Sequence, residues 1–523
     1  MIRIVSKRIP WLGIPVLVLV LFAFSGSPKP SLSEFDDRPN VIMFLVDDMG
    51  WQDTSVPFHT AETPFNRTYQ TPNMERLARQ GMVFTNAYAA SPVCTPTRTS
   101  IMTGQNPGRT RITNWTLRNS LAAQETGPKH YPLLSPEWRF EGLQPGDVTL
   151  PSVLKQQGYR TIHAGKAHFG ALATKGANPL MLGFDVNIAG HAAGAPGSYY
   201  GTHNYSASFR GRNEVWDVPG MRAYHGKNVN LTEAITIEAN RAIEDAVALG
   251  KPFYLNMAHY GVHTPIMADS QYVERYADLH PTEAAYASML EGMDASLGAI
   301  MHQLEALGQS TRTLIIFFSD NGGLSAHSRG TTPIGTGLNS HNLPLRSGKG
   351  AAYEGGIRVP MIVSWARRDA QHPLQQALQL PAGIRSKTPV ISDDFFPTIL
   401  DLTATVLPAG HVIDGTSLIP LLQGDVIEDR VLGWHYPHKW GPEGPGTDPF
   451  TAVRKGDWKL IYFYKDGRYE LYNLEKDLAE STDLAWKEPE KLDEMKTALR
   501  GWMEQVNAQV PHWRESGAPA ELE

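Results

Sequence analysis

Two apolar segments that each end in acidic residues constrain the fold most strongly. Asn40–Val46 is nearly continuous in apolar side chains and is followed by Asp47-Asp48. Thr313–Phe318 has the same character and is followed by Ser319-Asp320-Asn321-Gly322-Gly323. Short apolar runs of this kind are typical of strands buried on both faces of a largely parallel sheet. Because ligands bind beyond the carboxyl ends of strands in open α/β sheets, both polar clusters are predicted to lie at a binding edge.

Strand-like and helix-like segments alternate along most of the chain. Further strands are expected at Tyr159–Ala164, Pro252–Ala258 and Val359–Ser364. Amphipathic helices are expected between them, for example at Thr232–Leu249 and Ala284–Leu307. This alternation predicts a doubly wound α/β domain, which we assign to residues 38–425.

The pattern changes near residue 425. Short strands are expected at Thr451–Val453, Trp458–Tyr464 and Tyr469–Asn473, followed by a helix from about Glu488 to Val506. The stretch His435–Pro449 is rich in Gly and Pro and is predicted to be a loop. Residues 426–523 are therefore predicted to form a smaller C-terminal subdomain with an antiparallel sheet and one packing helix.

The N-terminus has the features of a secretory signal peptide, assigned to residues 1–27. Three basic residues precede an apolar run from Trp11 to Phe24, and Ser25-Gly26-Ser27 follows it. The run is shorter than the ~20 apolar residues of a transmembrane helix. We therefore expect a secreted or periplasmic protein with no stable membrane insertion after cleavage; an uncleaved anchor is the alternative.

Charge excludes one class of partner. The 523 residues include 47 basic and 53 acidic ones, giving a net charge of −6, and no long basic run occurs. This composition argues against nucleic-acid binding. If the substrate is anionic, a local cluster of basic side chains must attract it, because the overall field does not.

Cys94 is the only cysteine, so no internal disulfide can form. Thr95 is expected to cap a helix and Pro96 to occupy its first position, which would place Cys94 at a helix N-terminus. Free N–H groups there favour anions, and Arg98 lies about one turn further on. The residues therefore indicate a nucleophile beside an anion site, although a buried, inert thiol is the commoner fate of a lone cysteine. Spacing alone does not separate thiol chemistry from other chemistry.

The segment Cys94-Thr95-Pro96-Thr97-Arg98, followed by Thr103-Gly104, resembles the Cys-x-Pro-x-Arg signature of the formylglycine-dependent sulfatases of the alkaline phosphatase superfamily. The resemblance runs from about Pro39 to Pro511. Further blocks match in order: Asp47–Gly50, Gly165–His168, His263–Pro265, Ser319–Gly322, Lys349 and Tyr353–Pro360. Thr97 and Ala167 depart from the commonest family residues, Ser and an aromatic residue, and leave the Cys, Pro and Arg positions intact. The resemblance implies an alkaline phosphatase-like fold, with a large mixed sheet between helices.

The resemblance also implies the catalytic chemistry. In such sulfatases a formylglycine-generating maturation enzyme oxidises the cysteine to formylglycine (3-oxoalanine). One hydroxyl of the hydrated aldehyde attacks sulfur and the other later expels sulfate. Basic side chains neutralise the sulfate, His168 takes a proton from the second hydroxyl, and His263, with Lys349, protonates the leaving alcohol. The catalytic residues implied are Cys94, Arg98, Lys166, His168, His263 and Lys349, of which Arg98, Lys166, His263 and Lys349 also bind substrate.

A metal site follows from the donor atoms. Asp47, Asp48, Asp320 and Asn321 offer only oxygen ligands, which suit Ca²⁺ or Mg²⁺ and not zinc. The family usually holds calcium, so the resemblance implies one Ca²⁺ per chain, with the modified Cys94 as a further ligand. The ion would act as Lewis acid and template. Taken singly, each acidic group is more typical of a strand-end turn.

The sequence predicts hydrolysis of sulfate esters, with a sulfated saccharide as the expected substrate. Aromatic and polar residues in loops are candidates for the rim of a sugar site: Trp115, His191, His341, Arg346, His438 and Trp440. The Gly-rich stretch Gly190–Gly201 is a candidate cover, and His163 and His259 are interpreted as structural. Two alternatives stay open, a phosphodiesterase or phosphonate hydrolase of the same superfamily and a non-catalytic binder of sulfated glycans.

Overall fold

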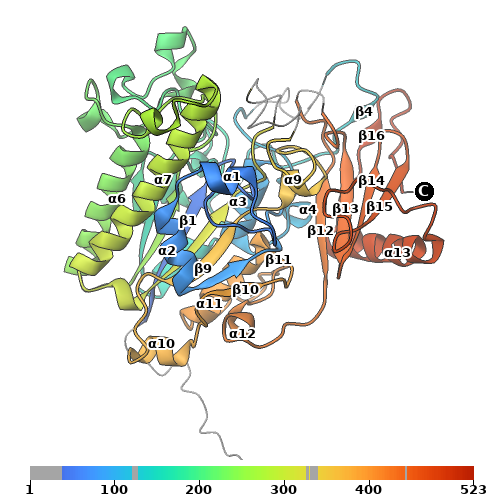
Figure 1. Ribbon diagram of the computed structural model, residues 1–523. Helices are drawn as coiled ribbons and strands as arrows, with labels where there is room; N and C mark the ends of the chain where they lie inside the picture. The colour runs from blue at the N-terminus through green and yellow to red at the C-terminus, as the bar shows by residue number, and fades with distance from the viewer. Residues whose placement is uncertain (1–37, 120–127, 326–328, 330–339, 442–443, 523) are drawn as a thin grey trace, which may run out of the picture.

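The computed structural model describes residues 38–119, 128–325, 329, 340–441 and 444–522. Its centre is an eight-stranded sheet, seen edge-on among helices in Figure 1. In spatial order the strands are β10 (Ile384–Ser386), β2 (Met82–Phe84), β9 (Met361–Trp365), β8 (Thr313–Ser319), β1 (Asn40–Val46), β7 (Phe253–Ala258), β5 (Arg160–Gly165) and β6 (Val186–Ile188). The five strands predicted from sequence correspond to β9, β8, β1, β7 and β5, which are neighbours in this sheet.

The sheet is mixed because of one strand. β9 runs antiparallel to both of its neighbours, β8 and β2, whereas all other pairs are parallel. The predicted large mixed sheet is confirmed. Its parallel part, β8-β1-β7-β5-β6, brings five carboxyl ends to one edge.

Helices cover both faces of this sheet. On β1, Ile42 and Phe44 face one core, and Val41 and Met43 face the other. The first core includes side chains of α2 (Pro72–Gln80), α6 (Leu231–Ala248) and α7 (Pro281–Ala306). The second core includes side chains of α3 (Cys94–Thr103), α5 (Leu150–Gln156) and α11 (Phe395–Leu402). Both faces are buried, which explains the unbroken apolar runs.

A second, four-stranded antiparallel sheet lies at the C-terminal side, at the right of Figure 1. Its order is β12 (Val431–Tyr436), β13 (Phe450–Lys455), β14 (Trp458–Phe463) and β15 (Arg468–Asn473). Helix α13 (Pro489–Val506) packs on one face, where Leu499 meets the core of the sheet. The other face packs toward Tyr88 of the large domain through Trp434. The predicted smaller antiparallel sheet with its helix is confirmed.

The predicted loop His435–Pro449 is wrong at its start. His435 and Tyr436 end strand β12 and pair with Thr451 and Phe450. The sequence hides this strand because Gly433 interrupts its apolar pattern. The glycine is required there, since a Cβ atom would lie 2.1 Å from the ring of Trp502.

Shorter elements complete the chain. Two-stranded sheets join β3 (Ala87–Tyr88) to β11 (Val390–Ile391) and β4 (Leu133–Leu134) to β16 (His512–Trp513). The remaining short helices are α1 (Pro64–Thr68), α4 (Pro107–Thr110), α9 (Glu354–Ile357), α10 (Pro373–Ala377) and α12 (Ile419–Leu422). Between β6 and α6 the chain runs through loops and short 3₁₀ turns, including η6 (Ser208–Arg210), η7 (Glu214–Trp216) and η8 (Arg222–Tyr224).

Two predictions about the ends of domains stay predictions. The predicted signal peptide, residues 1–27, lies outside the described residues. The predicted boundary at residue 425 falls between α12 and β12. Across the part of the chain that the structure describes, no helix combines the length and apolar character needed to cross a membrane.

Candidate active site

Strand register brings the predicted polar blocks together. Val46 of β1 pairs with Ser319 of β8, so the residues that follow, Asp47 and Asp320, leave the sheet side by side. Gly165 of β5 pairs with Ala258 of β7, and Lys166 follows directly. The edge predicted from the apolar runs is therefore a real meeting point of charged side chains.

Three carboxylates and three cations form a buried ion network at this edge. Lys166 Nζ lies 2.7 Å from Asp47 Oδ2, and Lys349 Nζ lies 2.6 Å from Asp48 Oδ1. Arg98 Nε donates to Asp320 Oδ2 at 2.7 Å. All these side chains are buried. Since the fixed charges balance, the site can accept an added cation together with an added anion.

Three oxygen atoms in this network lack a hydrogen-bond partner among the described residues: Asp47 Oδ1, Asp48 Oδ2 and Asn321 Oδ1. Unpaired buried acceptors are costly and call for an ion or water. Burial, reinforced by repulsion from Asp320, raises the pKa of Asp47 well above its ordinary value. A hard divalent cation would satisfy all three oxygens, so the residues present fit the predicted calcium site.

Cys94 is the first residue of α3, and its N-cap is Val93. The predicted cap at Thr95 is wrong, because the helix begins two residues earlier than expected. Pro96 is tolerated in this first turn, where its missing N–H has no partner to lose. Cys94 Sγ lies 3.4 Å from Lys349 Nζ. Cys94 therefore lies at a helix N-terminus, as predicted, but it is the first residue of the helix and does not precede it.

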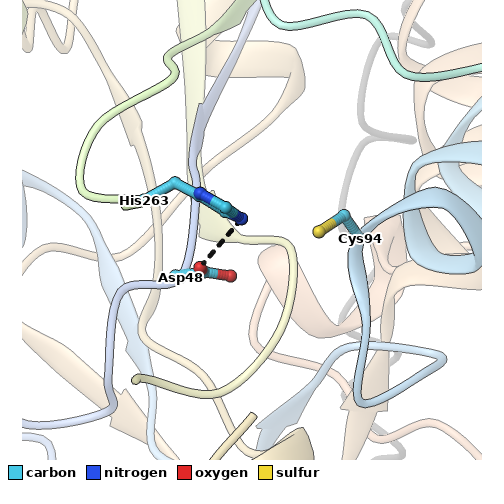
Figure 2. A group of neighbouring side chains, drawn as sticks. All are labelled: Asp48, Cys94 and His263. Carbon is cyan, nitrogen blue, oxygen red and sulfur yellow. Dashed lines mark ion pairs between the residues drawn. The ribbon is translucent and has the colours of Figure 1, made fainter. Parts of the chain in front are cut away.

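Cys94 also lies within two groups of side chains that could hold a metal ion: Asp48 with His263, and Asp47 with Asp320. Figure 2 shows its sulfur pointing toward the ring of His263, with Asp48 beside both. Burial raises the pKa of the Cys94 thiol, although Lys166 and Lys349 oppose this. An unmodified thiol here is therefore a poor nucleophile, since the thiolate is the reactive form.

His168 is fixed in one tautomer. Its Nε2 lies 2.6 Å from the carbonyl oxygen of Thr116. A carbonyl only accepts, so Nε2 carries the proton and Nδ1 is left as the basic atom. Nδ1 is buried and has no partner among the described residues. Burial, with Lys166 and Arg98 nearby, lowers the pKa of His168 well below its ordinary value, so the ring is neutral.

His263 presents its other nitrogen to the site. Nδ1 donates to the carbonyl oxygen of Thr264 at 2.8 Å, and Nε2 lies 3.6 Å from Asp48 Oδ2. Burial and Lys349 lower the pKa of His263 to about 3, against the opposite effect of Asp48. A negative group bound beside Nε2 would favour the protonated ring.

A pocket of about 420 Å³ opens above these side chains. Cys94, His168, His263 and Lys349 form its floor. The upper wall is lined by residues from several loops: Trp115, Gly194, Ala195, Pro196, Arg210, Arg212, Trp216, Thr264, Pro265, Leu324 and Trp440. This volume is in the range of small-molecule sites.

Sequence reasoning found only part of this wall. Among the six rim candidates, Trp115 and Trp440 line the pocket, and so does part of the Gly-rich stretch. Arg210, Arg212 and Trp216 were missed, because the surrounding segment has no periodicity and matches no block. The sequence offers one signal for these residues: three large side chains occur within seven residues of this segment.

The other four rim candidates pack elsewhere. The ring of His191 is tilted against that of Tyr260, His341 lies by Glu283, Arg346 covers Tyr353, and His438 contacts Trp138. His163 and His259 bond to the carbonyl oxygen of Gly165 and to Ser296, respectively. None of these six lines the pocket within the described parts of the chain.

Comparison with known families agrees with this geometry. Residues 39–406 match the family described as Sulfatase, and residues 348–509 match that described as N-sulphoglucosamine sulphohydrolase, C-terminal. The mixed sheet with polar residues at its carboxyl edge is the architecture of the alkaline phosphatase superfamily. Within that superfamily, the chain belongs to the sulfatase family. It is a sulfuric ester hydrolase.

Similar proteins cover most of the chain. A sulfatase of Formosa agariphila is 28% identical, with 95% of each chain covered. The N-acetylgalactosamine-6-sulfatase of Canis lupus familiaris is 29% identical over 88% of this chain and 77% of its own. The crystal structure of Ps i-CgsB in complex with k-i-k-neocarrahexaose matches with a TM-score of 0.69 and 25% identity, over 89% of this chain and 93% of the other.

Proposed function

We propose that this sulfatase removes sulfate from a sulfated saccharide, using a formylglycine made from Cys94 and one calcium ion. The observation that carries the proposal is the position of Cys94. It begins a buried helix at the floor of a pocket, beside three unpaired oxygen ligands. As a hydrate, the formylglycine would supply a hydroxyl nucleophile, while calcium would supply a Lewis acid.

Asp47, Asp48, Asp320 and Asn321 would hold the calcium ion. Three of them offer the unpaired oxygens, and the fourth, Asp320, is oriented by Arg98. Lys166 neutralises Asp47 at 2.7 Å, and Arg98 also donates to the carbonyl oxygen of Lys166. These contacts would hold the proposed ligands in place before any ion binds.

The sulfate group would bind over the floor of the pocket. Lys349 lies 3.4 Å from Cys94 Sγ and so reaches both the nucleophile position and a sulfate oxygen. His168 would accept a proton at Nδ1, since Nε2 is bonded to Thr116. His263 would deliver a proton from Nε2 to the leaving oxygen, since Nδ1 is bonded to Thr264. The two histidines thus offer opposite ring nitrogens for opposite tasks.

A saccharide fits the upper wall. Trp115, Trp216 and Trp440 come from three separate segments and line one pocket. Aromatic faces with a few polar groups are the usual lining of such sites. The similarity to an N-acetylgalactosamine-6-sulfatase and to a complex with a neocarrahexaose points the same way. We also propose export from the cytoplasm, on the strength of the basic and apolar pattern of residues 1–27.

The proposal is tested on the purified protein with and without coexpression of a cysteine-oxidising maturation enzyme. Peptide mass spectrometry measures the fraction of Cys94 converted from thiol to aldehyde, and metal analysis measures bound calcium. Hydrolysis of sulfated saccharides should rise in proportion to the aldehyde fraction. Full activity with wholly unmodified Cys94, or active enzyme without a divalent ion, would contradict the mechanism.

A further inference from the structure

The upper wall of the pocket carries two arginines with no assigned task. Arg210 ends η6 and Arg212 follows it, and both line the pocket together with Trp216. Arg210 Nη2 donates to the carbonyl oxygen of Gly197 at 2.6 Å, which ties this segment to the Gly-rich loop. Gly197 in turn lies against Ala207, where a Cβ atom would approach the backbone to 2.4 Å. The two loops therefore form one built wall.

The charges of the two guanidinium groups are not balanced by any residue that the structure describes. Within the described residues, neither Arg210 nor Arg212 forms an ion pair with a carboxylate. Partial loss of solvent around Arg210 lowers its pKa, and the charge of Arg212 lowers it further, so the two cations are close enough to repel each other. Among the described residues, the pocket lining contains no acidic side chain. Two like charges on one wall, without a counter-charge, are stabilised by a bound anion.

The two arginines differ from the floor residues in their exposure to solvent. At the floor, Lys349, His168 and Cys94 are each no more than 3% exposed. Arg210 and Arg212 are exposed, as is Trp115 at 42%. A sulfate ester held at the floor therefore leaves the two arginines facing a different part of the same substrate molecule.

We infer that Arg210 and Arg212 form a second anion subsite, which selects a saccharide carrying another negative group besides the sulfate that is removed. That group is a carboxylate or a second sulfate ester, both of which match the planar fork of a guanidinium. Trp115, Trp216 and Trp440 line the same pocket and would contact the sugar rings. This inference rests on the proposed function, because it names the class of saccharide for the same pocket.

The test compares substrates in pairs that differ by one anionic group. One pair is a sulfated disaccharide with and without a second sulfate, another has or lacks a carboxylate, and a third uses aryl sulfates with or without a carboxylate. The wild-type enzyme should favour the doubly charged member of a pair in kcat/KM. In the Arg210→Gln/Arg212→Gln variant this preference should fall about 10- to 100-fold, mainly through KM. The matched control is Arg222→Gln, an exposed arginine of η8 outside the pocket, which should keep the preference.

The three pairs separate the possible failures. Preference for only the sulfate or only the carboxylate pair supports the subsite and identifies its anion. If the wild-type enzyme prefers charged aryl sulfates and the double variant loses this preference, the subsite is supported. This holds even if the enzyme hydrolyses none of the saccharides, a result that would contradict only the proposal of a saccharide substrate. Equal losses on singly and doubly charged members would overturn the inference, as would a wild-type enzyme with no preference in any pair.

Discussion

The floor and the upper wall of the pocket are built in different ways. Cys94 begins a buried helix, and His168 and His263 follow the carboxyl ends of parallel strands β5 and β7. Lys349 lies on a loop and is held by a buried ion pair, with 2.6 Å between its Nζ and Asp48 Oδ1. Wall residues lie on loops and short 3₁₀ turns, and Arg210 and Arg212 have no carboxylate partner within the described residues. The register of the strands determines where the candidate catalytic side chains lie, whereas the loops determine which substrate the pocket recognises. Substitutions in the two regions should therefore differ in kind.

Removal of the proposed nucleophile should have the largest effect. Cys94→Ala leaves no side chain that can become an aldehyde, so turnover should fall roughly 10⁴-fold or more. Thermal unfolding should change little, because the ion pairs around Cys94 remain. Steady-state assays on sulfate esters and a melting curve check both points. Substantial activity in this variant would show that the floor does not act through Cys94.

The next largest effect is expected at the metal ligands. Asp320→Ala removes a proposed calcium ligand and also leaves Arg98 without its partner, since Arg98 Nε donates to Asp320 at 2.7 Å. Breaking a buried pair costs about 3–5 kcal/mol, so the melting temperature should fall together with bound calcium. Activity should drop about 10³-fold. Asp401→Ala, an exposed carboxylate on α11, is the matched control. Unchanged metal content in Asp320→Ala would remove Asp320 from the site.

The floor could be predicted from sequence because its residues adjoin strong patterns. The run Asn40–Val46 coincides with β1, and the acidic residues after it lie where the strand ends. Strand direction could not be predicted, since the side chains of β9 are the same whichever way it runs. β12 was missed because Gly433 weakens its pattern. Strands with continuous apolar runs could thus be predicted. The direction of β9 and the existence of β12 could not, because they depend on contacts with other parts of the chain.

The wall could not be predicted for a related reason. Whether a loop residue faces the pocket depends on how the loop packs, which its own sequence does not determine. Trp115 and Trp440 face the pocket, whereas His438 packs against Trp138. Packing against other loops, such as that between Gly197 and Ala207, determines which loop residues face the pocket.

A smaller effect should separate the two histidines of the floor. A general acid matters most for a poor leaving group, and such help is worth ~10²–10⁴-fold. His263→Ala should therefore slow a sulfated sugar far more than an activated aryl sulfate. His168→Ala should slow sulfate release whichever alcohol has left, giving a stoichiometric burst of alcohol in rapid-mixing assays. Equal losses on both substrates in both variants, without a burst, would mean that the histidines only bind sulfate.

The smallest effect is expected from one donor on the wall. The indole N–H of Trp440 is buried at the pocket without a partner among the described residues. Trp440→Phe keeps an aromatic ring and removes this donor. A sugar hydroxyl that accepts from it would lose one neutral hydrogen bond, so KM for a sulfated saccharide should rise about 5-fold. An aryl sulfate without hydroxyl groups should show a much smaller change.

The geometry around Trp440 makes the comparison of substrates necessary. Its ring lies over Gly350, where a Cβ atom would approach to 2.1 Å, and 6.0 Å from Lys349 Nζ. A smaller ring could therefore let Lys349 shift, which would weaken every sulfate ester alike and lower kcat as well as raise KM. A rise in KM confined to saccharides indicates recognition by the wall, and Trp486→Phe, at a residue 76% exposed, controls for loss of an indole elsewhere. Equal effects on both substrates would instead indicate that Trp440 holds Lys349 in position. Trp440 would then belong with the floor residues and not with the wall.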